Sequence, residues 1–291
     1  MLNLSENNLV DLPENLGDLV SLRVLNLAQN IIRTLPDTLG NLVNLCSLLM
    51  YQNMCRTLPD SIGNCVALQD MNFFNNRLTK LPATLSHCVS LKDINVSGNK
   101  LKTLPDPSSW GAIERIAAFG NHIVLLPDFA AVASTLLQLQ LNDNAIEHFP
   151  SFGTEPAVLE LCELNINQLH EISADDLAPL TSCKNLSVKH NQISVLPAAI
   201  CGMTALETLN IAKNLLTTFP QELGDCPALK VILAEHNPIG APPTQLLNLP
   251  QLYRVNLKDC GIDLAQPDTR AVMKELDTKC RSTARGGWAR Y

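Results

Sequence analysis

The stretch Leu22–Asn44, LRVLNLAQNIIRTLPDTLGNLVN, carries the pattern from which most of the chain is built. Its template is L-x-x-L-x-L-x-x-N-x-L-x-x-L-P, followed by about eight looser residues. The asparagine column shows how often the template recurs, because its members are 23 residues apart, with one spacing of 22 and one of 24. The column consists of Asn7, Asn30, Asn53, Asn76, Asn99, Asn121, Asn144, Asn167, Asn191, Asn214 and Asn237, and Cys260 takes the twelfth place.

The residue types of the template predict its local structure. The leucines of L-x-L alternate, so the segment is expected to be a short strand with one buried face and one outward face. One such strand cannot bury its apolar face, but stacked copies form a continuous parallel sheet over one core. The asparagine amide can satisfy backbone groups where the chain turns, and proline suits the return segment. The predicted fold is therefore an α/β right-handed solenoid curved like a horseshoe, with strands on the concave face and short helical turns on the convex face.

This pattern resembles the leucine-rich repeat signature, whose period lies within the same range. We expect about twelve repeats of 22–24 residues over residues 1–264. A helix over residues 265–281 is expected to cap the core, with Pro267 near its start, and residues 282–291 are expected to be a loose tail. Because Met1 already lies inside the first strand, we expect missing residues or another chain to cover the N-terminal edge.

Composition and charge restrict the class of protein. The net charge is −7 and the basic residues are interspersed with acids, which argues against a nucleic-acid surface. No apolar run is long enough for a membrane span, and no secretion signal stands at the amino terminus. The ten cysteines include no C-x-x-C motif and several replace core residues, which argues against disulfides and zinc. We therefore expect a cytoplasmic protein in a reducing environment.

A search for catalytic motifs finds no phosphate-binding loop, no dinucleotide fingerprint, no nucleophile elbow and no H-E-x-x-H. The six histidines do not cluster at ligand spacing. The sequence therefore predicts a chain that is not an enzyme, with no catalytic residues, no metal site and no cofactor.

One group of outward positions on the predicted strands is apolar and indicates a partner-binding site on the concave face. Most other outward positions are small or polar, and a regular asparagine column there is expected to be a solvated ladder. Exposed aromatic residues that are grouped commonly mark binding sites, although scattered surface residues without function are the alternative. We expect Ser97 and Gly98 to leave a shallow hollow between these residues, and Lys100 and His122 to extend a basic margin that Arg77 begins. The predicted site consists of Leu49, Tyr51, Phe74, Arg77 and Phe119.

A second candidate surface is charged and lies toward the carboxyl end of the array. Charged faces are commonly only solvated, and this is the alternative here. The residues of this surface are Lys189, His190, Lys213, Glu235, Arg254 and Lys258.

Two return segments, Pro36–Leu42 and Pro220–Cys226, carry a closer resemblance. They are similar to the L-P-x-x-[LI]-G-x-L segments of intracellular leucine-rich repeat proteins of the Ras-associated type, which include Ras suppressor, Scribble and Erbin-like proteins. The resemblance implies a non-enzymatic scaffold that binds a protein through its concave face, in signalling linked to small GTPases or phosphatases. No [KR]-V-x-F docking motif supports the phosphatase branch. The alternative is a recognition module of a larger enzyme, such as a kinase, ubiquitin ligase or GTPase. The sequence does not identify the partner.

Overall fold

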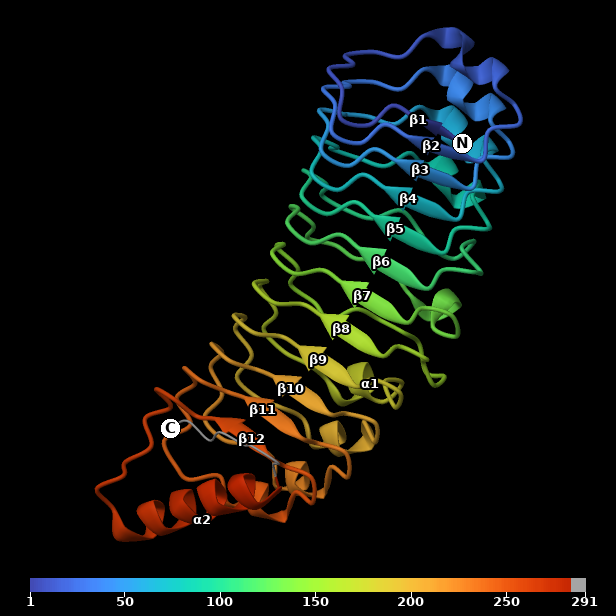
Figure 1. Cartoon of the computed structure of the whole chain (residues 1–291). Helices are drawn as coiled ribbons and strands as arrows, with labels where there is room; N and C mark the ends of the chain where they lie inside the picture. Colours follow the sequence, from blue (N-terminus) through green and yellow to red (C-terminus); the bar gives the residue numbers. More distant parts are fainter. Residues whose placement is uncertain (284–291) are drawn as a thin grey trace. The chain divides into compact units, whose positions relative to one another are not determined.

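The structure is a computed structural model that describes residues 1–283 (Figure 1). The chain divides into two compact units. Unit 1 comprises Met1–Ala145 and Pro150–Gly153, and unit 2 comprises Ile146–Phe149 and Thr154–Tyr291. Each unit is described by itself.

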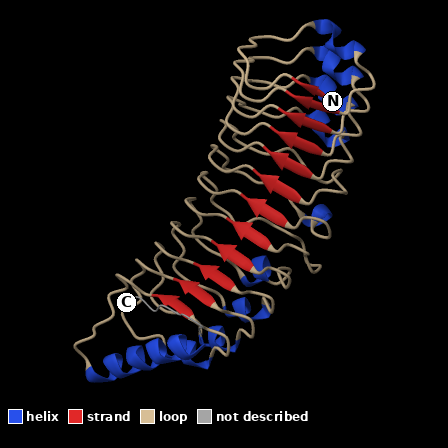
Figure 2. Cartoon of the chain, in the orientation of Figure 1, coloured by secondary structure: helices blue, strands red, loops and turns tan. Residues whose placement is uncertain are grey.

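Both units are built from short parallel strands that follow one another across the sheet in sequence order (Figures 1 and 2). Within each unit, neighbouring strands pair in fixed register, for example Leu25 with Leu48 and Leu48 with Met71. Unit 1 contains Leu2–Asn3 (β1), Val24–Asn26 (β2), Ser47–Leu49 (β3), Asp70–Asn72 (β4), Asp93–Asn95 (β5), Arg115–Ala117 (β6) and Gln138–Gln140 (β7). Unit 2 contains Leu161–Glu163 (β8), Asn185–Ser187 (β9), Thr208–Asn210 (β10), Val231–Leu233 (β11) and Arg254–Asn256 (β12).

The return segments form mostly 3-10 helices. Except for Ala130–Val132, which follows Phe129, these helices begin directly after a proline, as in Asp37–Asn41 after Pro36. Proline fixes φ and has no backbone N–H. It therefore fits directly before the helical turn, where no hydrogen bond from that N–H is required. Unit 1 has Glu14–Asp18 (η1), Asp37–Asn41 (η2), Asp60–Asn64 (η3), Ala83–His87 (η4) and Ala130–Val132 (η5). Unit 2 has Ala174–Leu177 (α1), Ala198–Gly202 (η6), Gln221–Asp225 (η7), Thr244–Asn248 (η8) and Pro267–Thr283 (α2).

The core lies between the strands and the return segments and consists of repeated aliphatic columns. Leu25, Leu48, Leu68 and Leu91 are among the many repeat residues with no exposed surface. Because the same column recurs in each coil, every repeat completes the core of its neighbour.

The asparagine column is the main polar element inside this core, as predicted. In Asn76 the Oδ1 atom accepts a hydrogen bond from the Cys55 N–H (3.0 Å), and Nδ2 donates to the Met50 and Phe73 carbonyls (2.8 and 3.1 Å). Two of these partners belong to the preceding coil, so Asn76 joins two repeats. The column residues from Asn30 to Asn237 make equivalent bonds to the preceding coil. Cys260 keeps half of this role, since its thiol donates to the Ala234 carbonyl at 3.2 Å.

The residue before each column asparagine, and before Cys260, adopts left-handed backbone in all twelve repeats. Its φ lies between 54° and 59° in ten non-glycine residues, from Glu6 to Asp259. Glycine takes the same place at Gly98 and Gly120. A β-branched residue in this conformation is strained, and Ile166 is one, with φ of 55°.

Replacing Ile166 with asparagine should therefore stabilise the protein. Asparagine tolerates left-handed backbone, and the Ile166 side chain is 48% exposed, so little core packing is lost. We expect a gain of about 1 kcal/mol in the free energy of unfolding, measured by urea denaturation. Lys213→Asn at the equivalent place is the control and should gain less, because lysine is not β-branched. Equal gains in both variants would contradict the strain explanation.

Three local features of the return segments follow from their residue types. Trp110 fills the apolar place on the return side, is 2% exposed, and donates from Nε1 to the Leu85 carbonyl at 3.0 Å. Ser173 caps α1 in a reciprocal capping box with Asp176. The first four repeats have a helical turn between proline and the following apolar residue.

The helix α2 begins at Pro267 and ends at Thr283, two residues beyond the predicted end. It buries Met273, Leu276 and Cys280 and packs against η8. Residues 284–291 of the predicted tail lie outside the described residues.

Candidate functional site

The side chains opposite the core form columns on the outward side of the strands, which we call the strand face. Positions in a column are counted from the repeat asparagine. Position −6 begins the strand, −4 ends it, −2 follows it, and +1 comes directly after the asparagine. The five residues of the predicted partner site all lie in unit 1, with Tyr51, Phe74 and Phe119 at −2, Leu49 at −4 and Arg77 at +1.

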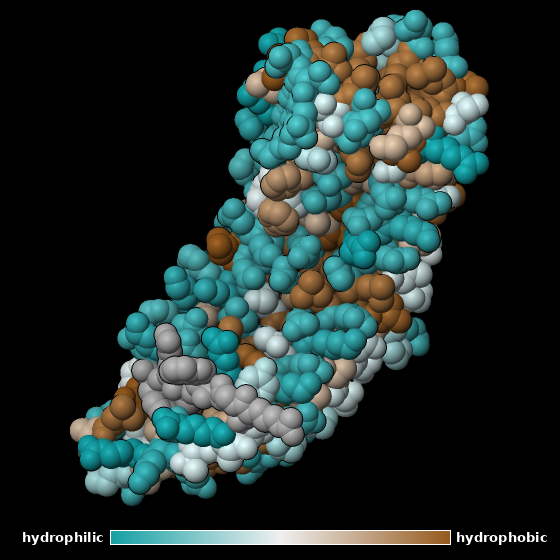
Figure 3. Space-filling view, in the orientation of Figure 1, coloured by the Kyte–Doolittle hydropathy of each residue, from teal (hydrophilic) through white to brown (hydrophobic). Residues whose placement is uncertain are grey.

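Two of the aromatic residues contact each other. Phe74 and Phe119 are two repeats apart, which corresponds to roughly 9.6 Å between strands. Their ring centroids are only 6.0 Å apart with planes at 48°, so the rings lean toward each other. Such a tilted pair is a favourable aromatic arrangement. Tyr51 lies one repeat earlier in the same column, and all three side chains are half-buried. Hydrophobic side chains gather over the first repeats in the space-filling view (Figure 3).

The predicted hollow at Ser97 and Gly98 is wrong. Ser97 lies between Phe74 and Phe119 and has no exposed surface. A Cβ placed on Gly98 would lie 3.6 Å from the Phe74 ring. The leaning rings therefore occupy the space that small residues would leave. Among residues 1–283, the Ser97 hydroxyl beneath them has no hydrogen-bond partner, which is a cost to stability.

The asparagines at −4 are not merely solvated. Asn72 Oδ1 accepts the Phe74 N–H at 3.0 Å, and Asn95 Oδ1 accepts the Ser97 N–H at 3.1 Å. Asn26, Asn210 and Asn256 make the same bond two residues along. These side chains therefore fix the backbone that carries the residues at −2.

On one side of the aromatic residues lies a margin of basic side chains. Arg77, Lys100 and His122 are exposed at +1, as expected from the sequence. The residues at +2 are buried, and those at +3 are exposed again. Position +3 is occupied by Arg33, Arg56 and Lys102. The Arg56 N–H donates to the Arg33 carbonyl at 3.3 Å, so the arginines at +3 lie on adjacent coils. The sequence analysis did not include these three residues. They occupy a second exposed column, two positions after the column that contains Arg77, and the repeat pattern could have identified it.

The opposite margin, at −6, is acidic. Asp70 and Asp93 are register partners on β4 and β5, and Arg115 Nε lies 2.8 Å from Asp93 Oδ2. Burial raises the pKa of the Asp70 carboxyl, and the neighbouring Asp93 charge raises it further. The aromatic residues therefore lie between an acidic and a basic margin.

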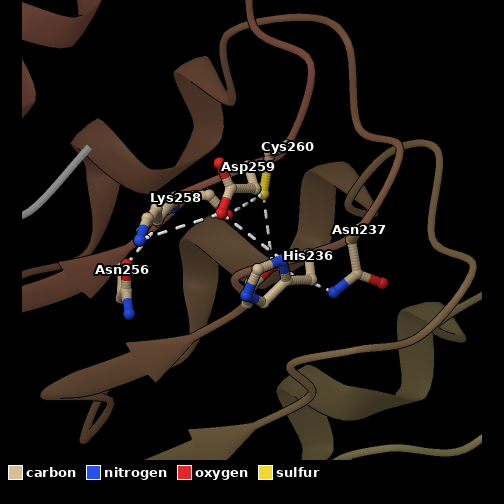
Figure 4. A network of polar contacts seen from close by, with 7 residues as sticks. His236, Asn237, Asn256, Lys258, Asp259 and Cys260 are labelled. Carbon is tan, nitrogen blue, oxygen red and sulfur yellow. Dashed lines mark hydrogen bonds and ion pairs between the residues drawn. The ribbon is translucent and has the colours of Figure 1, made fainter.

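The second candidate surface lies in unit 2 and is spread over three columns. Lys189, Glu235 and Lys258 stand at −2, His190 and Lys213 at −1, and Arg254 at −6. The structure thus separates Arg254 from the others across the strand face. Asp259 Oδ2 lies 3.4 Å from His236 Nδ1 and 4.0 Å from Lys258 Nζ (Figure 4). These side chains are about half exposed, so this network contributes little stability.

The cysteines behave as core residues. The buried and free cysteines include Cys55, Cys65, Cys88, Cys162, Cys183 and Cys226. Burial raises the pKa of the Cys55 and Cys65 thiols to about 11. Within residues 1–283, no group of three or more His, Cys, Asp or Glu side chains is arranged to hold a metal ion. Over the same residues, no helix has the length and apolar character that crossing a membrane requires.

Comparison with protein families identifies the class. A model described as a leucine-rich repeat region matches residues 1–180, and one described as leucine rich repeat matches residues 182–239. The chain therefore belongs to the leucine-rich repeat proteins, and the predicted leucine-rich repeat solenoid is confirmed.

Two curated relatives match less than half of the chain. The leucine-rich repeat and calponin homology domain-containing protein 1 of Mus musculus is 30% identical over 122 residues, which are 41% of this chain and 17% of that protein. The leucine-rich repeats and immunoglobulin-like domains protein 3 of Homo sapiens is 30% identical over 125 residues, which are 42% of this chain and 11% of that protein. The chain thus spans a small part of each relative.

A solved structure that resembles the chain is the leucine-rich repeat ectodomain of the membrane receptor kinase GASSHO1/SCHENGEN3 from Arabidopsis thaliana, in complex with Casparian strip integrity factor 2. It aligns with a TM-score of 0.69 at 26% identity and covers 88% of this chain and 35% of that one.

Proposed function

We propose that the chain is a non-catalytic interaction scaffold that binds a protein partner on the strand face of unit 1. Leucine-rich repeat domains generally mediate protein–protein interaction. The observation that carries the proposal is the Phe74–Phe119 ring pair, which stands on the strand face in the same column as Tyr51. A half-buried aromatic pair on the strand face offers a partner apolar area at low entropic cost.

The proposal predicts that Tyr51→Ala and Phe74→Ala remove partners without unfolding the chain. A central aromatic contact contributes about 2 kcal/mol or more to binding, which corresponds to roughly a 30-fold loss of affinity. Tagged wild-type and variant chains would be compared by quantitative affinity-purification mass spectrometry, with circular dichroism to check folding. A subset of partners should be lost from both variants.

The matched controls are Val66→Ala and Val89→Ala. Both valines belong to unit 1, are 48% and 53% exposed, and lie before the strands, away from the strand face. These variants should retain every partner. If the valine variants lose the same partners, or the folded aromatic variants lose none, the proposed surface is wrong.

A second proposal is that the solenoid is the recognition module of a larger protein, including an enzyme. It is favoured by the relatives, whose names include further domains and of which the match is 17% and 11%. The similar plant ectodomain belongs to a receptor kinase. Transcript sequence that joins a catalytic domain to this chain would support the module, and a transcript that encodes only the repeats would contradict it.

For the cellular setting we propose the reducing cytoplasm and signalling linked to GTPases or phosphatases. The ten cysteines are free and eight are buried, which suits a reducing compartment. The return segments Pro36–Leu42 and Pro220–Cys226 resemble those of Ras-associated repeat proteins. The similarity to a receptor ectodomain favours the opposite location, and fractionation of cells that express the chain would decide.

A further inference from the structure

The cations of unit 1 are concentrated on one side of the strand face. Between Met1 and Ala145 the chain has nine Lys and Arg residues, and only Arg23, Lys92 and Arg115 lie elsewhere. The other six define what we call the basic edge, namely Arg33, Arg56, Arg77, Lys80, Lys100 and Lys102. Random placement of charges on a solvated surface would mix the two signs.

The basic edge is not neutralised by the protein itself. All six side chains belong to exposed residues, and within residues 1–283 none of them takes part in a salt bridge. The acids of unit 1 lie largely on other sides. Asp37 and Asp60 begin 3-10 helices on the return side, and Asp70 and Asp93 are at the far margin of the strand face.

The basic edge adjoins the aromatic residues directly. In the fourth repeat only Asn75 and the buried Asn76 separate Phe74 from Arg77, and Asn75 turns the chain with φ of 55°. Adjacent repeats are about 4.8 Å apart, so one extended segment crossing several repeats would meet both surfaces.

From this arrangement we propose that the partner binds through an acidic extended segment with at least one large apolar side chain. Its apolar side chain packs against Tyr51, Phe74 and Phe119, and its carboxylates lie along the basic edge. This inference rests on the proposed function, because it uses the same strand face. The net charge of −7 favours a protein segment over RNA or an anionic membrane, since extended polyanions would also face the acidic remainder of the chain.

The test is a selection of random twelve-residue peptides on the full wild-type chain. We expect the enriched peptides to carry net negative charge and an aromatic or large aliphatic residue. Their affinity, measured by fluorescence anisotropy, should fall with added salt, because the contacts on the basic edge are exposed. Variant Arg77→Glu/Lys100→Glu should bind the enriched peptides on the order of 10 to 100-fold more weakly.

The matched control reverses two cations elsewhere, with Arg23→Glu/Lys274→Glu. Both residues are exposed and lie off the basic edge, so the chain acquires the same net charge. This variant should keep the affinity within about two-fold, which excludes a general effect of net charge. Thermal unfolding by circular dichroism checks that both double variants fold.

Enrichment of neutral or basic peptides, failure to enrich any, or equal loss in the control variant would overturn the inference. A further arm uses a fifteen-nucleotide RNA and vesicles containing phosphatidylserine. Tighter binding of either, lost in Arg77→Glu/Lys100→Glu, would also overturn it.

Phe74→Ala separates the two proposals. If neutral peptides are enriched and Phe74→Ala still weakens them, the proposed function stands and the acidic partner fails. If acidic peptides need the basic edge but not Phe74, the aromatic site fails.

Discussion

Replacing Asn76 with alanine should lower the free energy of unfolding by about 2 to 4 kcal/mol, because one buried N–H loses its partner and two buried carbonyls each lose one hydrogen bond. The amide accepts the Cys55 N–H and donates to the Met50 and Phe73 carbonyls. Alanine leaves the N–H without this acceptor, whereas the two carbonyls keep a second bond from Asn53 and Asn99 (3.2 and 2.9 Å). Asn76 is 7% exposed, so water compensates poorly. Urea denaturation followed by circular dichroism measures the loss.

Two variants make this test specific. Asn7→Ala removes the same residue type where it is exposed and donates only within its own repeat, to Leu4 and Ser5, so we expect a loss of at most about 1 kcal/mol. Asn76→Cys should fall between the two, since Cys260 shows that a thiol can supply the donor but not the acceptor. Equal losses for Asn7→Ala and Asn76→Ala would show that burial in the column does not matter.

Replacing Gly40 with alanine should cost about 2 to 3 kcal/mol through steric overlap between adjacent return segments. A Cβ at Gly40 would lie 2.5 Å from the Ser61 carbonyl oxygen and 2.7 Å from the Ser61 Cβ. These atoms belong to backbone and a rigid first side-chain carbon, so relief requires η2 and η3 to move apart. Thermal unfolding should show a clear fall in the midpoint.

Gly202→Ala is the matched control in η6. Nothing lies within 4 Å of a Cβ built there, so alanine should be neutral or stabilise by up to about 1 kcal/mol by reducing the freedom of the unfolded chain. A comparable loss at Gly202 would mean that the cost comes from changing glycine itself rather than from close packing of the helices.

The repeat column predicted the fold well because the same physical requirement recurs in every coil. An apolar face that one strand cannot bury, and an amide that joins two coils, leave few alternatives to stacking. Trp110 could be placed on the return side for the same reason, since its repeat lacks the usual leucine there.

The arrangement of side chains on the strand face could not be predicted from the repeat pattern. The periodicity shows that Phe74 and Phe119 point outward, but not that their rings close over Ser97. The left-handed residue before each asparagine also has no common residue type, as Glu6, Ile166 and Lys213 all occupy it. Its conformation follows from the turn, which each repeat imposes on whatever residue stands there. The basic edge, in contrast, was present in the sequence and needed only the counting of a second column.

Photo-crosslinking tests the central claim, binding through the strand face of unit 1, most directly. Benzoylphenylalanine would replace Tyr51 at −2 or Asp37 at the start of η2, both in the full chain. We predict crosslinks to a partner protein from position 51 that are reduced by Phe74→Ala, and none to that partner from position 37. Crosslinking from position 37 alone, or equally from both positions, would contradict the account.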